Sequence, residues 1–297
     1  MTTPQLNTIK SKDFYGEYRG HTVSHLKTIL NCMKYLNSQK NYIYLAGDSS
    51  LDNKYWLPND ELLPAVNDYQ YILHPPQMKP DIAYHMNKLL DGTKYTAINT
   101  AVEESTIASR QSDLLAQDKF INQNITNNDI LIVSIGGNDI ALSPSYSTML
   151  NMSMMMYMNS IESINKGPSV AWGMNHFVDL FKNKSRDYIL RLIGDKRPKK
   201  IIVCMIYYPD QKTTGGWADR TLDYLNYNAD PKKLQAAINQ IFVHGTSNIK
   251  INGTEIIPFP MYKILNGKNT NDYIQRVEPS SQGGGKLAQG FVKCCLE

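Results

Sequence analysis

Residues 42–53 read Tyr-Ile-Tyr-Leu-Ala-Gly-Asp-Ser-Ser-Leu-Asp-Asn, and this stretch decides the fold expected for the whole chain. Residues 42–45 are an unbroken aromatic and aliphatic run, which is typical of a strand buried on both faces of a parallel sheet. Gly47 removes bulk where the chain must turn, and Asp48 and Ser49 are residue types that bond backbone amides at turns and helix starts. Open α/β sheets bind ligands at the carboxyl ends of their strands, so Ser49 either faces a ligand or is a helix N-cap.

The bulk composition indicates a soluble globular protein. The 297 residues are 42% hydrophobic and 20% charged, and a net charge of +4 is too weak to favour nucleic-acid binding. No stretch approaches the ~18 consecutive apolar residues that a membrane span needs. The N-terminus lacks the apolar segment of a secretory signal, and the four cysteines show no metal-site spacing. We therefore expect no metal or cofactor, and a cytoplasmic or other reducing intracellular location.

Strand-like and helix-like segments alternate along the chain. The strand-like segments are residues 42–46, 95–99, 129–135, 200–208 and 255–259. This alternation predicts a mostly parallel five-stranded sheet with helices on both faces, in a three-layer α/β/α sandwich. Residues 1–39 are expected to form an N-terminal arm and helix, and residues 40–297 a single α/β domain with a helical insertion at about 145–195.

A second motif, Gly-Gly-Asn-Asp from residue 136, follows the strongest strand pattern at residues 129–135. This motif and residues 47–53, Gly-Asp-Ser-Ser-Leu-Asp-Asn, stand in the order found in SGNH (GDSL-type) hydrolases, so the chain resembles that family. The resemblance, together with the strand–helix alternation, implies a flavodoxin-like strand order of 2-1-3-4-5. It also implies hydrolysis of a small-molecule ester or acyl substrate without a cofactor. In the family's scheme Ser49 would be the nucleophile and Asn138 a donor to the oxyanion.

Two departures from the family's pattern bear on the chemistry. Where a glycine supplies the family's second oxyanion N–H, this chain has Glu104. We expect the Glu104 carboxylate to point away from the site, pair with a cation or stay protonated. The family's last block carries a histidine and, three residues before it, an aspartate. Here those positions are Glu278 and Gln275, while Pro279 and Ser280 match in register, so the Ser-His-Asp triad is absent as written.

Three interpretations of the missing histidine stay open. In the first, Glu278 is the general base, held by Gln275 or the residue after it, with a pKa raised by burial and by a second carboxylate such as Glu104. In the second, another histidine replaces it, and His74 in a long loop or His176 in the insertion could reach in. In the third, the protein is a catalytically silent relative that binds a ligand or serves as a structural subunit of a larger assembly.

The remaining candidate residues are assigned by their positions. Asp48, Asp52 and Asn53 should shape the nucleophile loop, the last two by capping the helix expected after it. Tyr207 and Tyr208 end the fourth strand, where they either line the cleft or pack against neighbours.

A run of methionines at residues 149–158 follows the second motif. Flexible thioethers suit an acyl pocket or an adaptable protein surface, whereas the density of apolar residues favours a helix buried on most of its faces. If the protein binds a protein partner, this helix and the N-terminal extension are the expected contacts.

Overall fold

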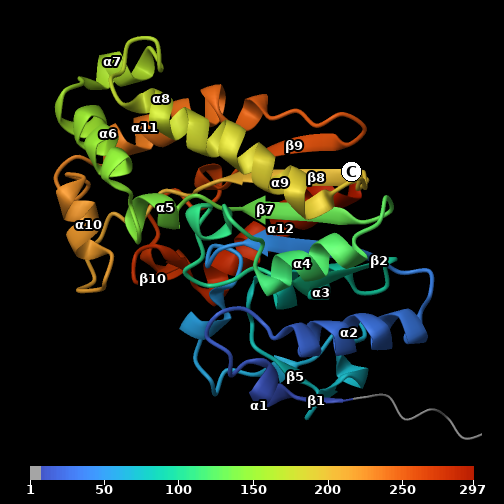
Figure 1. Ribbon diagram of the computed structural model, residues 1–297. Helices are drawn as coiled ribbons and strands as arrows, with labels where there is room; N and C mark the ends of the chain where they lie inside the picture. The colour runs from blue at the N-terminus through green and yellow to red at the C-terminus, as the bar shows by residue number, and fades with distance from the viewer. Residues whose placement is uncertain (1–7) are drawn as a thin grey trace, which may run out of the picture.

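A five-stranded parallel sheet forms the centre of the computed structural model, which describes residues 8–297 (Figure 1). From one edge to the other, its strands are β6 (Tyr95–Asn99), β2 (Asn41–Gly47), β7 (Ile130–Ser134), β8 (Lys200–Met205) and β9 (Glu255–Pro260). The predicted α/β class and the strand order 2-1-3-4-5 are confirmed. The fourth strand ends three residues earlier than expected, because beyond Met205 neither neighbouring strand pairs with it.

Alternate residues of β2 point into two different hydrophobic cores. Tyr42, Tyr44 and Ala46 belong to one core, and Ile43 and Leu45 to the other. All five are buried, which explains why the sequence of this strand is apolar without alternation.

Helices cover both faces of the sheet and complete the three layers (Figure 1). The first core is closed by α2 (Val23–Leu36), α4 (Ala116–Asn124), α8 (Met174–Asp179), α9 (Ser185–Ile193) and α11 (Pro231–His244). The second core is closed by α3 (Ile82–Leu90) and α12 (Ser281–Leu296), which pack against each other. Because all five strands are parallel, the loops after β2 and β7 leave the same edge of the sheet and bring the two sequence motifs together.

The segment between β7 and β8 is helical. It comprises α5 (Asn138–Ala141), α6 (Tyr146–Tyr157), α7 (Ile161–Asn165), α8 and α9. In Figure 1, α6 stands at one end of the molecule, with α10 (Asp219–Tyr224) beside it and α7 above it. Helix α6 buries Met152 and Met155 but exposes Met149 and Leu150, so the expectation that most of its faces are buried is wrong. The run of methionines at residues 149–158 places apolar residues all around the helix, but only part of the helix packs on neighbouring elements.

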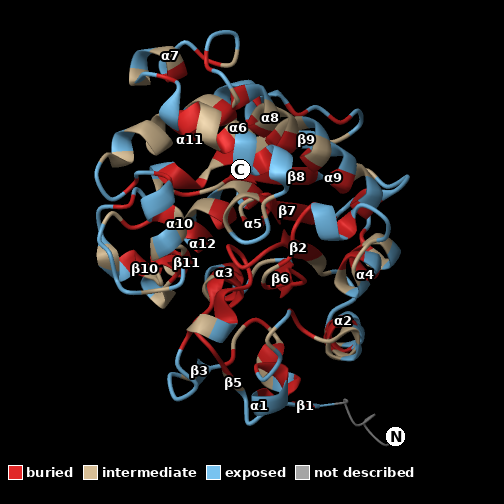
Figure 2. Ribbon diagram, turned by 60° about the vertical axis from the view of Figure 1, so that its left-hand side comes forward, coloured by how far each residue is buried: buried red, intermediate tan, exposed pale blue. Residues whose placement is uncertain are grey.

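The N-terminal segment packs on the long loop that follows the nucleophile strand. Strand β1 (Ile9–Lys10) pairs with β4 (Leu73–His74), and nearby β3 (Leu63–Pro64) pairs with β5 (Gln77–Met78). Phe14, the last residue of α1 (Ser11–Phe14), is buried in the first core. These elements form the lower part of the molecule in Figure 2. The first seven residues of the expected arm lie outside the described part of the chain.

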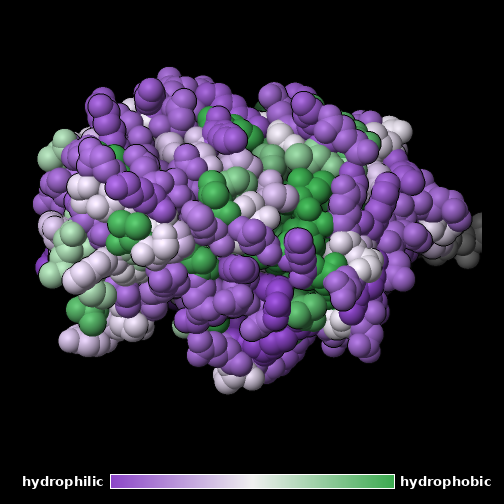
Figure 3. Space-filling model, turned by 90° about the horizontal axis from the view of Figure 1, so that it is seen from above, coloured by the Kyte–Doolittle hydropathy of each residue, from purple (hydrophilic) through white to green (hydrophobic). Residues whose placement is uncertain are grey.

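The outer surface is mostly hydrophilic, as seen from above in Figure 3, with a hydrophobic strip on the side where β9 forms the edge of the sheet. Ile256 and Ile257 of this edge strand are half-buried. Pro258 and Pro260 have no N–H to offer, which protects the edge from pairing with another strand. Among residues 8–297, no helix is both long and apolar enough to cross a membrane.

Candidate active site

The nucleophile loop begins where β2 meets β7. Gly47 has a φ of +127°, and a Cβ at this position would overlap the carbonyl oxygen of Ser134. Glycine is therefore required, and the N–H of Asp48 donates to the same oxygen over 3.0 Å. Ser49 follows at the carboxyl edge of the sheet, with only 7% of its surface exposed.

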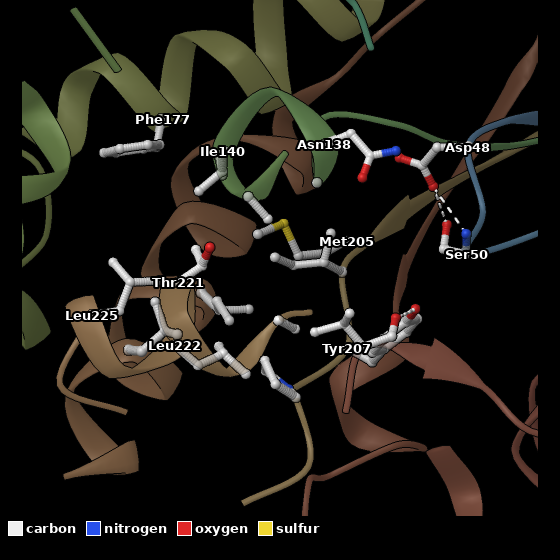
Figure 4. A pocket seen from close by; sticks show the side chains of 18 of the residues that line it. Asp48, Ser50, Asn138, Ile140, Phe177, Met205, Tyr207, Thr221, Leu222 and Leu225 are labelled. Atoms are coloured by element: carbon white, nitrogen blue, oxygen red, sulfur yellow. Dashed lines mark hydrogen bonds between the residues drawn. The ribbon is translucent and has the colours of Figure 1, made fainter. Parts of the chain in front are cut away.

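Asp48 and Ser50 stabilise the loop on either side of Ser49. The N–H and the hydroxyl of Ser50 donate to Asp48 Oδ1 over 3.1 and 2.6 Å, as Figure 4 shows. The Ser50 hydroxyl also lies 2.6 Å from that of Ser134. Burial raises the pKa of Asp48 to about 6. The Ser50 hydroxyl is therefore engaged by Asp48 and by Ser134 at the end of β7.

Asn53 does not cap a following α-helix, which corrects the expectation for it and for Asp52. The chain continues into a short 3₁₀ helix (Asn53–Trp56) that has no side-chain cap. Asn53 Oδ1 instead accepts from the N–H of Ile82 at the start of α3 over 3.1 Å, and its Nδ2 donates to the carbonyl of Pro279 over 3.0 Å. Asn53 thereby ties the nucleophile loop to the C-terminal segment of the site.

Glu278 is brought to Ser49 by strand β11 (Glu278–Pro279), which pairs with β10 (Tyr273–Ile274). Glu278 is 2% exposed and lines the same cavity as Ser49. Within the described chain, Glu278 Oε2 has no hydrogen-bond partner. Burial holds the pKa of Glu278 well above its usual range, the charge of Glu103 raises it further, and the Ser49 hydroxyl lowers it.

The second carboxylate at the site is Glu103, a residue that the sequence reading did not single out. Glu103 is 3% exposed, and its Oε1 accepts from the indole N–H of Trp56 over 3.1 Å. Its Oε2 has no hydrogen-bond partner among the residues described. Burial, and then the charge of Asp52, raise the pKa of Glu103 to about 8. Because ionisation of Glu103 or Glu278 opposes ionisation of the other, the pair retains a proton near neutral pH.

Glu104 points away from this pair, so the suggestion that it supplies the second carboxylate is wrong. Its carboxylate accepts from the Tyr18 hydroxyl over 2.8 Å and pairs with Arg19, which lowers the pKa of Glu104. The backbone of Glu104 has a φ of +58°, in the left-handed region that favours glycine. The backbone thus keeps a glycine-like conformation at Glu104, while the Glu104 side chain binds the N-terminal segment.

The three N–H groups expected to stabilise an oxyanion are available to a ligand. Asn138 is 9% exposed, and its Nδ2 donates one hydrogen to the carbonyl of Ser105 over 3.1 Å. This bond orients the amide and leaves the second Nδ2 hydrogen available to a ligand. In the part of the chain that the structure describes, no hydrogen bond uses the backbone N–H of Ser49 or of Glu104.

Asp52 and Lys54 form an ion pair that is completely buried next to Glu103. Lys54 Nζ lies 2.7 and 2.9 Å from the two carboxylate oxygens of Asp52. Asp52 also accepts from the N–H of Gly20 over 3.0 Å, from that of Glu103 over 3.2 Å and from Asn99 Nδ2 over 3.3 Å. Asp52 therefore positions the backbone of Glu103, and the sequence offered no signal that Lys54 would be buried.

Gln275 and Arg276 do not hold Glu278, which corrects the expected orienting role. Both have a positive φ, +51° and +70°, and the chain reverses there. The Gln275 amide lies against Gly216, while the buried Arg276 donates to Asp219 and to the carbonyl of Asp210.

No histidine in the described part of the chain lines the cavity that contains Ser49. His74 is exposed on β4, in the loop that pairs with the N-terminal segment. His176 bonds the Thr148 hydroxyl over 3.1 Å. The structure therefore brings neither candidate histidine to Ser49.

The two tyrosines after β8 have different surroundings. Tyr207 lines the cavity, and its hydroxyl donates to the carbonyl of Val277, next to Glu278. Tyr208 instead stacks on Tyr262, with ring centroids 4.9 Å apart and an angle of 18° between the planes.

A cavity of about 130 Å³ extends from Ser49 into the helical part of the molecule (Figure 4). Its lining residues with a carboxyl or amide side chain gather at the Ser49 end, as do the two serines: Asp48, Ser49, Ser50, Asn138 and Glu278. Helices close the far end with apolar side chains, among them Met152, Met155, Phe177, Leu222, Leu225, Ile238 and Ile241. Within residues 8–297, no group of three or more His, Cys, Asp or Glu residues is placed to hold a metal ion.

No protein-family model and no curated protein sequence matches the chain. Solved structures with a similar chain path include the lipase Lip_vut3 from a goat rumen metagenome, at 10% identity, covering 85% of this chain and 96% of that one, with a TM-score of 0.48. The acetylxylan esterase Axe2 from Geobacillus stearothermophilus is 15% identical, with coverages of 85% and 93% and a TM-score of 0.45. The carbohydrate acetylesterase Est24 from Sinorhizobium meliloti is 10% identical, with coverages of 86% and 99% and a TM-score of 0.44. The fold assignment itself rests on the sheet order described above.

Proposed function

We propose that the chain is a carboxylic-ester hydrolase in which Ser49 is the nucleophile and Glu278 the general base. The observation that carries this proposal is that the buried Glu278 carboxyl group lines the same cavity as Ser49, with an Oε2 atom that has no hydrogen bond in the described chain. Its position in the sequence is that of the histidine in the family that the chain resembles.

The proposed reaction proceeds through an acyl-enzyme. Ser49 Oγ attacks the ester carbonyl carbon as its proton passes to Glu278, and the N–H groups of Ser49, Glu104 and Asn138 stabilise the oxyanion. Glu278 then returns the proton to the departing alkoxide. In the second half, Glu278 takes a proton from water as the water oxygen attacks the acyl carbon. The bond from the acyl carbon to Ser49 Oγ then breaks, Glu278 returns the proton to Ser49 Oγ, and the acid is released.

The raised pKa of Glu278 makes this scheme chemically reasonable. A carboxylate with an ordinary pKa of about 4.3 is a feeble base for a serine hydroxyl. A buried carboxylate beside a second carboxyl group holds a proton more strongly, so its ionised form is a stronger base. Glu103 would act as a positioning residue that raises the basicity of Glu278 without touching the substrate.

Labelling by a fluorophosphonate probe tests the nucleophile. The probe should modify Ser49, identified by peptide mapping, and Ser49→Ala should lose both this label and the hydrolysis of a p-nitrophenyl ester. Circular dichroism of the variant should show an unchanged fold. Hydrolysis that survives in Ser49→Ala would contradict the proposal.

The pH dependence of activity and that of stability should run in opposite directions. Activity should rise with pH, because the base must lose its proton, and the raised pKa of Glu278 moves this rise above the range of an ordinary glutamate. The free energy of unfolding should fall as pH rises toward 8, because the folded protein binds the protons of Glu103 and Glu278 more tightly than the unfolded chain does.

Glu103→Gln tests whether the charge of Glu103 contributes to both pH dependences. Removing the neighbouring charge should shift the midpoint of the pH–rate profile downward by about one unit, equivalent to about 1.4 kcal/mol, and should flatten the decline in stability. Glu104→Gln is the matched control, because its carboxylate faces Arg19, and the midpoint should not move. An unchanged midpoint in Glu103→Gln would show that Glu103 does not tune the base.

A catalytically silent binding subunit is the second candidate, and the exposed apolar face of α6 favours it. Tyr146, Met149, Leu150, Tyr157 and Met158 all lie exposed on this helix or at its end. Such a surface suits a protein partner, whereas the described N-terminal segment already packs on its own chain. Absence of Ser49 labelling in a folded protein would favour this candidate.

The location of the protein in a reducing intracellular compartment stays a prediction.

A further inference from the structure

The cavity beside Ser49 is polar at one end and apolar at the other. Among the residues that the structure describes, its only lining residues with a carboxyl group are Asp48 and Glu278, both at the reactive end. Figure 4 shows Asp48, Ser50 and Asn138 on one side of the cavity, and Leu222 and Leu225 on the opposite side.

The apolar end would leave the hydroxyl groups of a sugar or the amides of a peptide without partners. Thr221 is the one polar side chain on that part of the wall in the described chain. Burying an unpaired hydroxyl or amide is costly, whereas methylene groups gain free energy on leaving water. An acetyl group would leave most of the 130 Å³ unfilled.

The entrance side of the cavity is also apolar. Trp217 lines the cavity and is 38% exposed, so it connects the interior to the surface. Helix α10, which follows it, is held to α6 by the Tyr157–Tyr224 ring contact, with centroids 6.2 Å apart, and by a 2.7 Å bond between the Ser153 and Tyr224 hydroxyls. Residues 140–161, which include α6, contain no Asp, Glu, Lys or Arg.

We infer that the substrate is an ester of an apolar acyl chain longer than acetyl, and that the acyl chain lies in the cavity between α6, α10 and α11. This inference rests on the proposed function of Ser49 for the chemistry, and on the lining of the cavity for the class of acyl group. The ester carbonyl lies at Ser49, and the alcohol portion lies outside the apolar end.

Hydrolysis of p-nitrophenyl esters with acyl chains of two to twelve carbons tests the inference. The value of kcat/KM should rise about fourfold for each added methylene, the ratio that corresponds to about 0.8 kcal/mol per buried CH₂, and should level off when the cavity is full. Thr221→Trp fills the apolar end and should shift the optimum to shorter chains. Arg220→Trp is the matched control, because Arg220 is exposed on the same helix and does not line the cavity.

Binding to the Ser49→Ala variant separates this inference from the proposed function. Calorimetry with saturated fatty acids of four to twelve carbons should show affinity that increases with chain length, and Thr221→Trp should abolish this increase. If the acids bind in this way while wild-type protein hydrolyses no ester, the acyl site stands and the proposed function fails. If wild-type protein hydrolyses all chain lengths equally and Ser49→Ala binds no acid, the acyl site is overturned and the proposed function stands.

Discussion

Glu278→Gln is expected to lower kcat for ester hydrolysis by about 10²–10⁴-fold, the range that general acid–base catalysis contributes. Glutamine keeps the shape of the side chain but cannot accept the Ser49 proton. The melting temperature should stay nearly unchanged, because the wild-type carboxyl group is buried without a cation and has Glu103 as an unfavourable neighbour in its ionised form. Steady-state kinetics and a thermal melt on the same preparation measure both quantities.

Two further variants make this result specific. Asp113→Asn also converts a carboxylate to an amide, but at a highly exposed residue paired with Lys119, and it should change neither kcat nor the melting temperature. Ser49→Ala should be as inactive as Glu278→Gln, because nucleophile and base act as a unit. Full activity in Glu278→Gln, with loss in Ser49→Ala, would mean that another group serves as the base.

Lys54→Met should lower the free energy of unfolding by about 3–5 kcal/mol, the cost of removing one partner from a buried ion pair. The Asp52 carboxyl group would be left with no exposed surface and without its cation. Loss of the Lys54 cation would also raise the pKa of Glu103, which the lysine lowers, so the pH–rate profile should shift toward higher pH. Urea unfolding monitored by circular dichroism measures the first effect.

The double variant Asp52→Asn/Lys54→Met tests whether the carboxyl group left without its cation causes the loss of stability. It should recover part of the lost stability, because no uncompensated charge remains in the interior. Lys119→Met is the matched control, since it removes a lysine from an exposed pair and should leave the unfolding curve unchanged. The single variant Asp52→Asn completes the cycle, and a loss in the double variant equal to the sum of the two single losses would show that the two charges are not coupled.

Local patterns in the sequence determined the sheet and the place of the nucleophile. The apolar run that ends at Gly47 predicts a central strand because a strand buried on both faces needs apolar residues at every position. Ser49 and Asn138 lie at the carboxyl ends of neighbouring strands, and parallel pairing alone brings such ends to one edge. These features depend on the chemistry of consecutive residues, so they can be read without the tertiary structure.

The tertiary structure decided which side chains surround Ser49. Glu103 and Glu104 are adjacent and chemically identical, and only the left-handed backbone at Glu104, with its bonds to Tyr18 and Arg19, sends the second one outward. The buried cation of Lys54 and the reversal of the chain at Gln275 depend in the same way on segments that are distant in sequence. Burial and neighbouring charge set the pKa of a carboxyl group, and both are properties of packed segments, so the basicity of Glu278 arises only in the folded protein.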